Sequence, residues 1–140
     1  MGRAEVSPAP LLDTHAWVWW LRRDPRLSDA SIEQLDAFEY DDRPRLADIS
    51  LWEVAMLVQS KRLQLDAPLR DWLEIASHPR TVRVVPISAA IASETTALSR
   101  TLRDPADRLI VATSRILGSP LLTYDRVILR SRLAERWVPD

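Results

Sequence analysis

The chain has 140 residues, of which 46% are hydrophobic and 28% are charged, and its formal net charge is −1. This length fits one domain, and the composition is that of a folded globular protein, which excludes a disordered or fibrous chain. The charge balance excludes a generally cationic surface, so binding to nucleic acid needs a local basic patch. Cysteine is absent, which excludes disulfides and thiolate metal sites and leaves oxygen donors and two histidines for any metal ion.

No apolar run approaches the roughly 20 residues that span a bilayer, and the N-terminal residues lack the apolar segment of a secretory signal. We therefore predict a cytoplasmic protein with no membrane partner. We interpret residues 1–9 as a loose N-terminal leader and residues 10–140 as a single domain.

Short apolar runs alternate with helical patterns along the chain, which is typical of βαβ units and a parallel sheet. Strands are predicted at residues 10–14, 45–50, 81–87, 120–125 and 135–139. Helices are predicted at residues 15–23, 28–40, 51–63, 67–78, 88–100, 105–117 and 126–133. Their expected N-caps are Ser28, Ser50, Asp66, Ser88 and Asp104, with Gly118 ending the sixth helix. The expected fold class is α/β, a three-layer sandwich with a central, mainly parallel five-stranded sheet.

Four acidic residues stand at the ends of these elements. Asp13 and Asp125 end predicted strands, whereas Glu53 and Asp107 lie in the first turns of predicted helices. Ligands of open parallel sheets bind outside the carboxyl ends of the strands. Topology alone predicts that three of the acids, Asp13, Glu53 and Asp125, lie at that edge. Asp107 joins them only if its helix runs antiparallel to the strand that it precedes.

Each acid taken singly also has a structural interpretation. Glu53 lies three residues after Ser50 and could close a capping box, and Asp107 suits the positive end of a helix dipole. A cap or turn role remains open for Asp13. Together, however, crowded carboxylates repel one another, and a divalent cation removes that penalty. Mg²⁺ prefers oxygen ligands, and two such ions about 3.5–4 Å apart would activate water and stabilise the leaving oxygen of a phosphodiester. The pattern predicts metal-assisted phosphodiester hydrolysis.

Three segments carry a family resemblance: "LLDTHAWVWWL", "ISLWEVAMLVQSKRLQL" and "DPADRLIVATSRILGSPLLTYDRVI". In this order they resemble the PIN-domain ribonucleases, in particular the VapC toxins of type II (VapBC) toxin-antitoxin systems, from Pro10 onward. The resemblance implies a PIN-like fold, a Mg²⁺- or Mn²⁺-dependent endoribonuclease that acts on RNA, a cognate antitoxin as partner, and a homodimer.

The resemblance also implies roles for individual residues. The catalytic acids and metal ligands of the family match Asp13, Glu53, Asp107 and Asp125. Asp104 matches the first acid of the "DPxDR" motif, where a capping and supporting role is expected. Thr14 and Thr123 match polar positions beside the metal and could orient carboxylates or water. Tyr124 is bulkier than the small or basic residue expected before the last acid, which affects the shape of the substrate cleft.

Several conspicuous residues have other expected roles. His15 has no Ser or Cys nucleophile as a partner, so we do not interpret it as catalytic. Trp17, Trp20 and Leu21 share a helical face and are predicted to be core. Trp19 then points elsewhere, and an exposed tryptophan favours contact with an antitoxin helix or a second protomer.

Two arginines directly follow acids of the predicted site, Arg108 after Asp107 and Arg126 after Asp125. Either could hold a substrate phosphate or pair with a neighbouring acid, and pairing is the preferred interpretation.

Other function classes fit less well. A response-regulator receiver needs a lysine near the acidic pocket, and Lys61 falls at the far end of a helix. A haloacid-dehalogenase-type phosphatase needs a second Asp two residues after the first, where this chain has His15. The remaining alternative is a non-catalytic PIN-like protein that binds RNA or a protein partner.

Overall fold

The computed structural model describes residues 8–140, which form four parallel strands in the order β3-β2-β1-β4. The strands are β1 (Leu11–Leu12), β2 (Arg45–Ala47), β3 (Arg83–Val85) and β4 (Leu121–Leu122). Each lies inside a predicted run but is shorter. Most of the predicted leader, residues 1–7, lies outside the described residues, whereas Ala9 at its end is buried.

The predicted fifth strand at residues 135–139 is wrong. This segment makes a single parallel bridge, between Arg136 and Leu121. The Leu121 N–H donates to Glu135 O, and the Trp137 N–H donates to Leu121 O, both at 2.8 Å. Because β4 has only two residues, its edge is too short for this segment to form a longer ladder. The Trp137 ring enters the core instead and is 3% exposed.

All seven predicted helices form, although most are shorter than predicted. They are α1 (Thr14–Arg22), α2 (Asp29–Ala37), α3 (Ile49–Gln59), α4 (Leu69–Ala76), α5 (Ala89–Thr95), α6 (Pro105–Leu117) and α7 (Arg126–Ser131), and a short 3₁₀ helix, η1 (Tyr40–Asp42), precedes β2. Ser28, Ser88 and Asp104 act as the predicted N-caps. Gly118 ends α6 in the left-handed conformation, with φ of 62°.

Two predicted caps are wrong. Helix α3 begins before Ser50, because the Leu51 N–H already donates to Asp48 O at 3.1 Å. Helix α4 begins after Pro68, whose carbonyl accepts the first helical hydrogen bond, and no side chain caps it. Asp66 therefore lies outside the helix.

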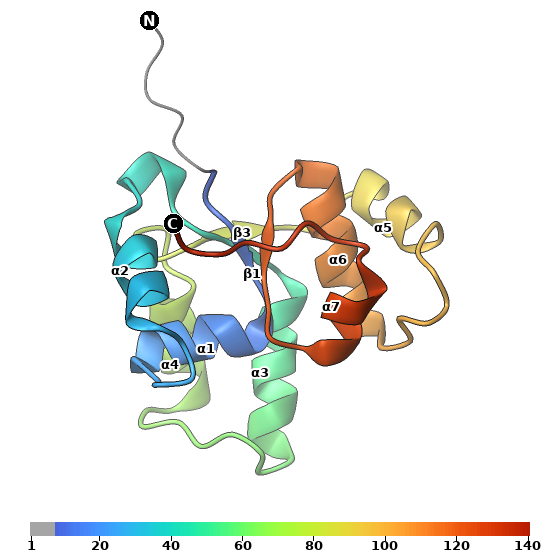
Figure 1. Cartoon of the computed structure of the whole chain (residues 1–140). Coiled ribbons are helices and arrows are strands. Elements are labelled where there is room, and N and C mark those ends of the chain that lie inside the picture. The colour runs from blue at the N-terminus through green and yellow to red at the C-terminus, as the bar shows by residue number, and fades with distance from the viewer. Residues whose placement is uncertain (1–7) are drawn as a thin grey trace, which may run out of the picture.

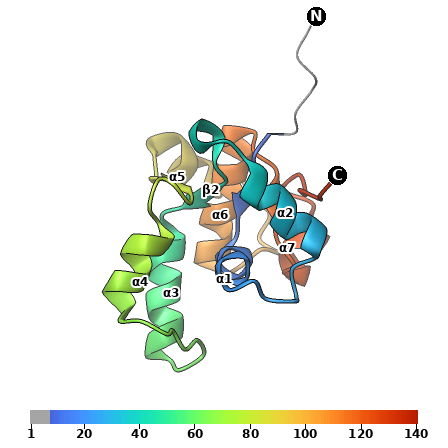
Figure 2. The same cartoon turned by 90° about the vertical axis from the view of Figure 1, so that its left-hand side faces the viewer.

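The strands separate two hydrophobic cores, because successive side chains of a strand point to opposite faces of the sheet. The first core contains Leu12, Leu46 and Leu122 and packs against α1, α2, α3 and α4. The second contains Leu11, Ala47 and Leu121 and packs against α5, α6 and α7. Figures 1 and 2 show α1 and α2 on one side of the strands and α6 and α7 on the other. The predicted three-layer α/β arrangement is confirmed, with four strands.

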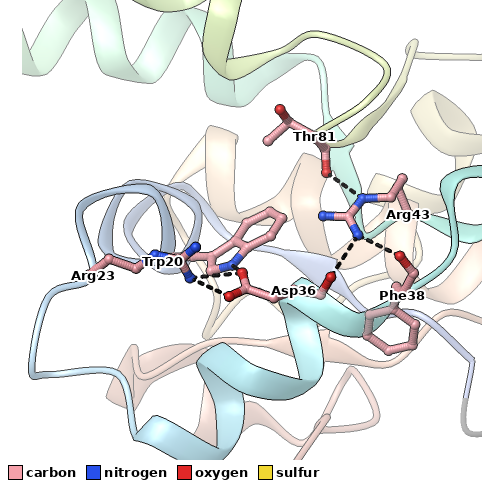
Figure 3. Close-up of polar contacts among 6 residues, drawn as sticks. All are labelled: Trp20, Arg23, Asp36, Phe38, Arg43 and Thr81. Atoms are coloured by element: carbon pink, nitrogen blue, oxygen red, sulfur yellow. Dashed lines mark hydrogen bonds and ion pairs between the residues drawn. The ribbon is translucent and has the colours of Figure 1, made fainter.

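A polar network fixes the end of α1 against α2 (Figure 3). The Trp20 indole donates to Asp36 at 2.8 Å, and Arg23 donates to both oxygens of the same carboxylate at 2.7 and 2.8 Å. Arg43, 9% exposed, donates to the Thr81 carbonyl at 3.3 Å. The network thus anchors the C-terminal end of α1, whose N-terminal end lies at the carboxyl end of β1.

Within residues 8–140, no helix is both long enough and apolar enough to cross a membrane.

Candidate active site

A cleft of about 640 Å³ lies at the carboxyl ends of β1 and β4, next to the starts of α3 and α6. Its walls include five acidic side chains: Asp13, Glu53, Asp104, Asp107 and Asp125. The structure thus brings together the four acids singled out in the sequence and adds Asp104. Asp107, whose position topology left open, joins the others because α6 begins at this edge. We call this space the acid cleft.

Asp13 follows β1 and is only 7% exposed. One carboxylate oxygen accepts a hydrogen bond from the Ala16 N–H at 2.8 Å and caps α1, and the other accepts one from the Thr123 hydroxyl. Burial raises the pKa of Asp13 above its ordinary value, although both hydrogen bonds oppose the rise. The cap role left open in the sequence is therefore real, and it coexists with a position in the acid cleft.

Glu53 lies in the second turn of α3, where it cannot close the capping box that the sequence suggested. Its carboxylate accepts a hydrogen bond from the Thr14 hydroxyl, which also lies 2.9 Å from the Ser50 hydroxyl. Burial raises the pKa of Glu53, the Thr14 hydrogen bond opposes this, and the charge of Asp104 adds to the rise. Thr14 thus orients Glu53 within the cleft.

Asp104 and Asp107 occupy the start of α6. Asp104 caps the helix by accepting a hydrogen bond from the Asp107 N–H at 3.0 Å. The Asp107 carboxylate is half-buried and accepts no hydrogen bond from any residue in 8–140. Burial, followed by the charges of Asp104, Asp125 and Glu53, raises the pKa of Asp107 to about 7.

Asp125 follows β4 and caps α7, accepting a hydrogen bond from the Ile128 N–H at 3.0 Å. Its own N–H donates to the Thr123 hydroxyl oxygen at 3.0 Å, while that hydroxyl donates to Asp13. Thr123 therefore links the two acids that follow β1 and β4, which are neighbouring strands.

The donor set fits a hard divalent cation such as Mg²⁺ or Mn²⁺. Carboxylate oxygens of Glu53, Asp104 and Asp107 all lie within 4.8 Å of one another, and Asp13 and Asp125 line the same cleft. Oxygen ligands suit these ions. A cation would offset both the burial and the mutual repulsion that raise the pKa values of Asp13, Glu53 and Asp107. Asp104, expected only as a supporting cap, also has a carboxylate oxygen within reach of such an ion.

Aromatic side chains form one wall of the acid cleft. Trp19 is half-buried, not exposed as predicted, and packs against the first core. Its ring centroid lies 5.7 Å from that of Tyr124 and 6.0 Å from that of His15. Trp17 and Trp20 are buried, as predicted. The contact of Trp19 with an antitoxin or a second protomer stays a prediction.

A second cleft of about 700 Å³ adjoins the acid cleft and shares with it His15, Trp19, Arg26, Leu57 and Arg62. Its lining adds Arg22, so three arginines and one acid, Asp66, lie in the space beyond the carboxylates. Arg26 and Arg62 are not predicted from the sequence. Both lie in loops after helices, where no motif or spacing relates them to the acids.

The prediction that Arg108 pairs with an acid is wrong. Its guanidinium donates to backbone carbonyls in the segment that follows α5, at Thr95, Leu98, Ser99 and Leu102. This explains why the predicted helix 88–100 ends at Thr95, since the next carbonyls bond to Arg108 instead of continuing the helix. Arg126 is exposed and forms no ion pair within residues 8–140.

Comparison with known proteins agrees with this fold. The PIN domain family matches residues 11–132. Ribonuclease VapC22 of Mycobacterium tuberculosis is 42% identical over 118 residues, which is 83% of this chain and 86% of that protein.

Three solved structures share the fold at low sequence identity. FitAcB from Neisseria gonorrhoeae has a TM-score of 0.63 and 21% identity, covering 92% of this chain and 96% of that one. FitAB bound to an IR36 DNA fragment has a TM-score of 0.62 and 20% identity, covering 91% and 92%. A toxin-antitoxin complex from Klebsiella pneumoniae has a TM-score of 0.55 and 19% identity, covering 84% and 87%. The chain therefore belongs to the PIN-domain family and is a VapC-type member of it.

Proposed function

We propose that the chain is a Mg²⁺- or Mn²⁺-dependent endoribonuclease and the toxin of a toxin-antitoxin pair. The observation that carries this proposal is the meeting of five carboxylates, from four separate segments of the chain, in one cleft. The similarity to Ribonuclease VapC22 supports RNA as the substrate class.

The proposed ligands of the metal are Asp13, Glu53, Asp107 and Asp125. A bound divalent cation would acidify a water molecule and stabilise negative charge on the phosphodiester. Thr14 and Thr123 hold the carboxylates of Glu53 and Asp13 in fixed orientations, so these groups need little rearrangement to bind.

The electrostatics of the acid cleft make substrate binding depend on the cation. Without a cation, the cleft repels the phosphates of RNA. With one, the excess negative charge falls, and Arg26 and Arg62 at the junction with the second cleft can attract the flanking phosphates. Arg26 already pairs with Asp24 at 2.7 Å, so Arg62 carries the less compensated charge.

A cognate antitoxin is the proposed protein partner, and a homodimer is the proposed assembly. The similarity to VapC22 supports the antitoxin, and one of the structural neighbours is a toxin-antitoxin complex. Analytical ultracentrifugation of the free chain tests the homodimer.

The test of the activity is incubation of the purified chain, free of antitoxin, with total bacterial RNA in Mg²⁺, Mn²⁺ or EDTA. Wild-type protein should produce discrete new ends that require metal, and Asp107→Asn should produce none. Asp71→Asn is a matched control, because Asp71 also lies in the first turn of a helix, α4, but outside the acid cleft. If folded, metal-loaded wild type cuts no RNA, the non-catalytic binding protein becomes the better account.

A further inference from the structure

Tyr124 occupies an unusual position in the acid cleft. Its two chain neighbours are fixed, Thr123 by its hydrogen bond to Asp13 and Asp125 by capping α7. The Tyr124 ring lines the acid cleft and is 37% exposed. Its hydroxyl makes no hydrogen bond within residues 8–140. The backbone on both sides therefore holds the Tyr124 ring beside the carboxylates.

Trp19 supports the ring from the core side. The two ring centroids are 5.7 Å apart at an interplanar angle of 42°, and Trp19 is itself held by the first core and by Arg26, 4.6 Å from its centroid. Arg136 approaches the Tyr124 ring at 5.9 Å, close to the outer limit of about 6 Å for a cation–π contact. Arg136 is exposed, so a better partner can displace it from Tyr124.

A flat apolar face in a polar, carboxylate-lined cleft suits a ligand with both a ring and a phosphate. Proteins that recognise single-stranded RNA stack its bases on Tyr, Trp, Phe or His side chains. We propose that Tyr124, supported by Trp19, stacks on a nucleobase next to the phosphate in the acid cleft, and so positions the bond to be cut and contributes to nucleotide preference. This inference rests on the proposed ribonuclease function.

The surroundings favour RNA over a protein side chain as the occupant. The aromatic wall leads into the second cleft, where Arg22 and Arg62 can meet the phosphates of flanking nucleotides. A strand of RNA would therefore find in order a site for its reacting phosphate, a stacking face and cationic side chains.

Binding of fluorescein-labelled RNA octamers tests the inference. The probes are oligo(A), oligo(U), oligo(C) and an abasic ribose-phosphate octamer, with Ca²⁺ in place of Mg²⁺ to slow cleavage. Tyr124→Leu should weaken binding of base-bearing octamers about tenfold and leave the abasic octamer unchanged, because stacking needs the ring and the base. Tyr124→Phe should bind like wild type.

Tyr40→Leu is the matched control. Tyr40 is also exposed and also has an arginine over its ring, Arg83 at 5.2 Å, but it lies on η1, outside the acid cleft. Its variant should bind all the octamers normally. Thermal unfolding of both Leu variants checks that they fold.

The outcomes separate the two proposals. If wild type binds and cuts RNA and Tyr124→Leu behaves identically, the stacking inference is wrong and the ribonuclease stands. An equal loss for base-bearing and abasic octamers would also overturn the inference, as would weakened antitoxin binding with RNA binding intact. If wild type binds none of the octamers and cuts no RNA, both proposals fail.

Discussion

Replacing Asp107 with asparagine should stabilise the metal-free protein at alkaline pH. The pKa of Asp107 is raised from 3.8 to about 7, so between these values the folded state binds more protons than the unfolded state. The free energy of unfolding must then fall as pH rises through this window, and the loss is complete above the folded pKa. Asparagine carries no charge at any pH and escapes this loss.

The size of the effect follows from the same two values. A difference between 3.8 and about 7 corresponds to about 4 kcal/mol for an unscreened group. Asp107 is only half-buried, and solvent screening reduces this to about 1–2 kcal/mol. Loss of a favourable charge at the start of α6 subtracts about 0.3–1 kcal/mol. The net gain at pH 8 is about 1 kcal/mol, or roughly 3–5 °C in melting temperature.

Thermal unfolding in EDTA at pH 5 and pH 8 measures this gain. The gain of Asp107→Asn over wild type should be larger at pH 8 than at pH 5, because at pH 5 only part of the loss has occurred. Asp71→Asn, at the same position of the first turn in α4, should show no such difference. Mg²⁺ at pH 8 should stabilise wild type more than Asp107→Asn. An Asp107→Asn protein with the same pH dependence as wild type would refute the proposed crowding of carboxylates.

Three further substitutions test other contacts. Thr123→Val should lower the free energy of unfolding in urea by about 1–3 kcal/mol, because it removes the donor to the buried Asp13 carboxylate; unchanged stability would show that this hydrogen bond is not needed. Arg108→Met should cost about 2 kcal/mol or more, because carbonyls after α5 lose their donor. A stable Arg108→Met protein with weakened RNA binding would instead assign Arg108 to a phosphate. If Arg126 holds a phosphate, Arg126→Ala should reduce the salt slope of RNA binding by roughly one, whereas an unaltered slope would exclude that contact.

Much of the fold follows from local sequence. The caps Ser28, Ser88 and Asp104 are correct because an N-cap depends on the few residues that follow it. Paired leucines such as Leu11 and Leu12 indicate a strand buried on both faces, and they do enter opposite cores. The length of a strand, unlike a helix cap, depends on the neighbouring strand with which it pairs. Residues 135–139 have a plausible strand sequence but meet a β4 that offers a single bridge.

The features of the site likewise fall into those that the local sequence indicates and those that depend on packing. Asp13 can be identified from sequence, because an acid directly after a buried strand needs a compensating partner. Asp125 is exposed and lies three residues after β4, so this argument does not extend to it. The capping box that the sequence left open for Glu53 does not form, because α3 begins at Ile49, two residues before the predicted start at Leu51, and no side-chain cap marks this start. Contacts between distant segments carry no local pattern at all. The carbonyls that hold Arg108 and the half-buried position of Trp19 both depend on packing.

Diffraction from crystals soaked in Mn²⁺ tests whether the acid cleft binds a divalent cation, because the anomalous signal locates the cation without relying on activity. We expect an anomalous peak within coordination distance of carboxylates in the acid cleft, Asp107 among them. Asp107→Asn crystals should show no peak there when Mn²⁺ occupies any other sites as fully as in wild-type crystals. A wild-type cleft that stays empty at saturating Mn²⁺, or a cation bound only outside it, would contradict the account.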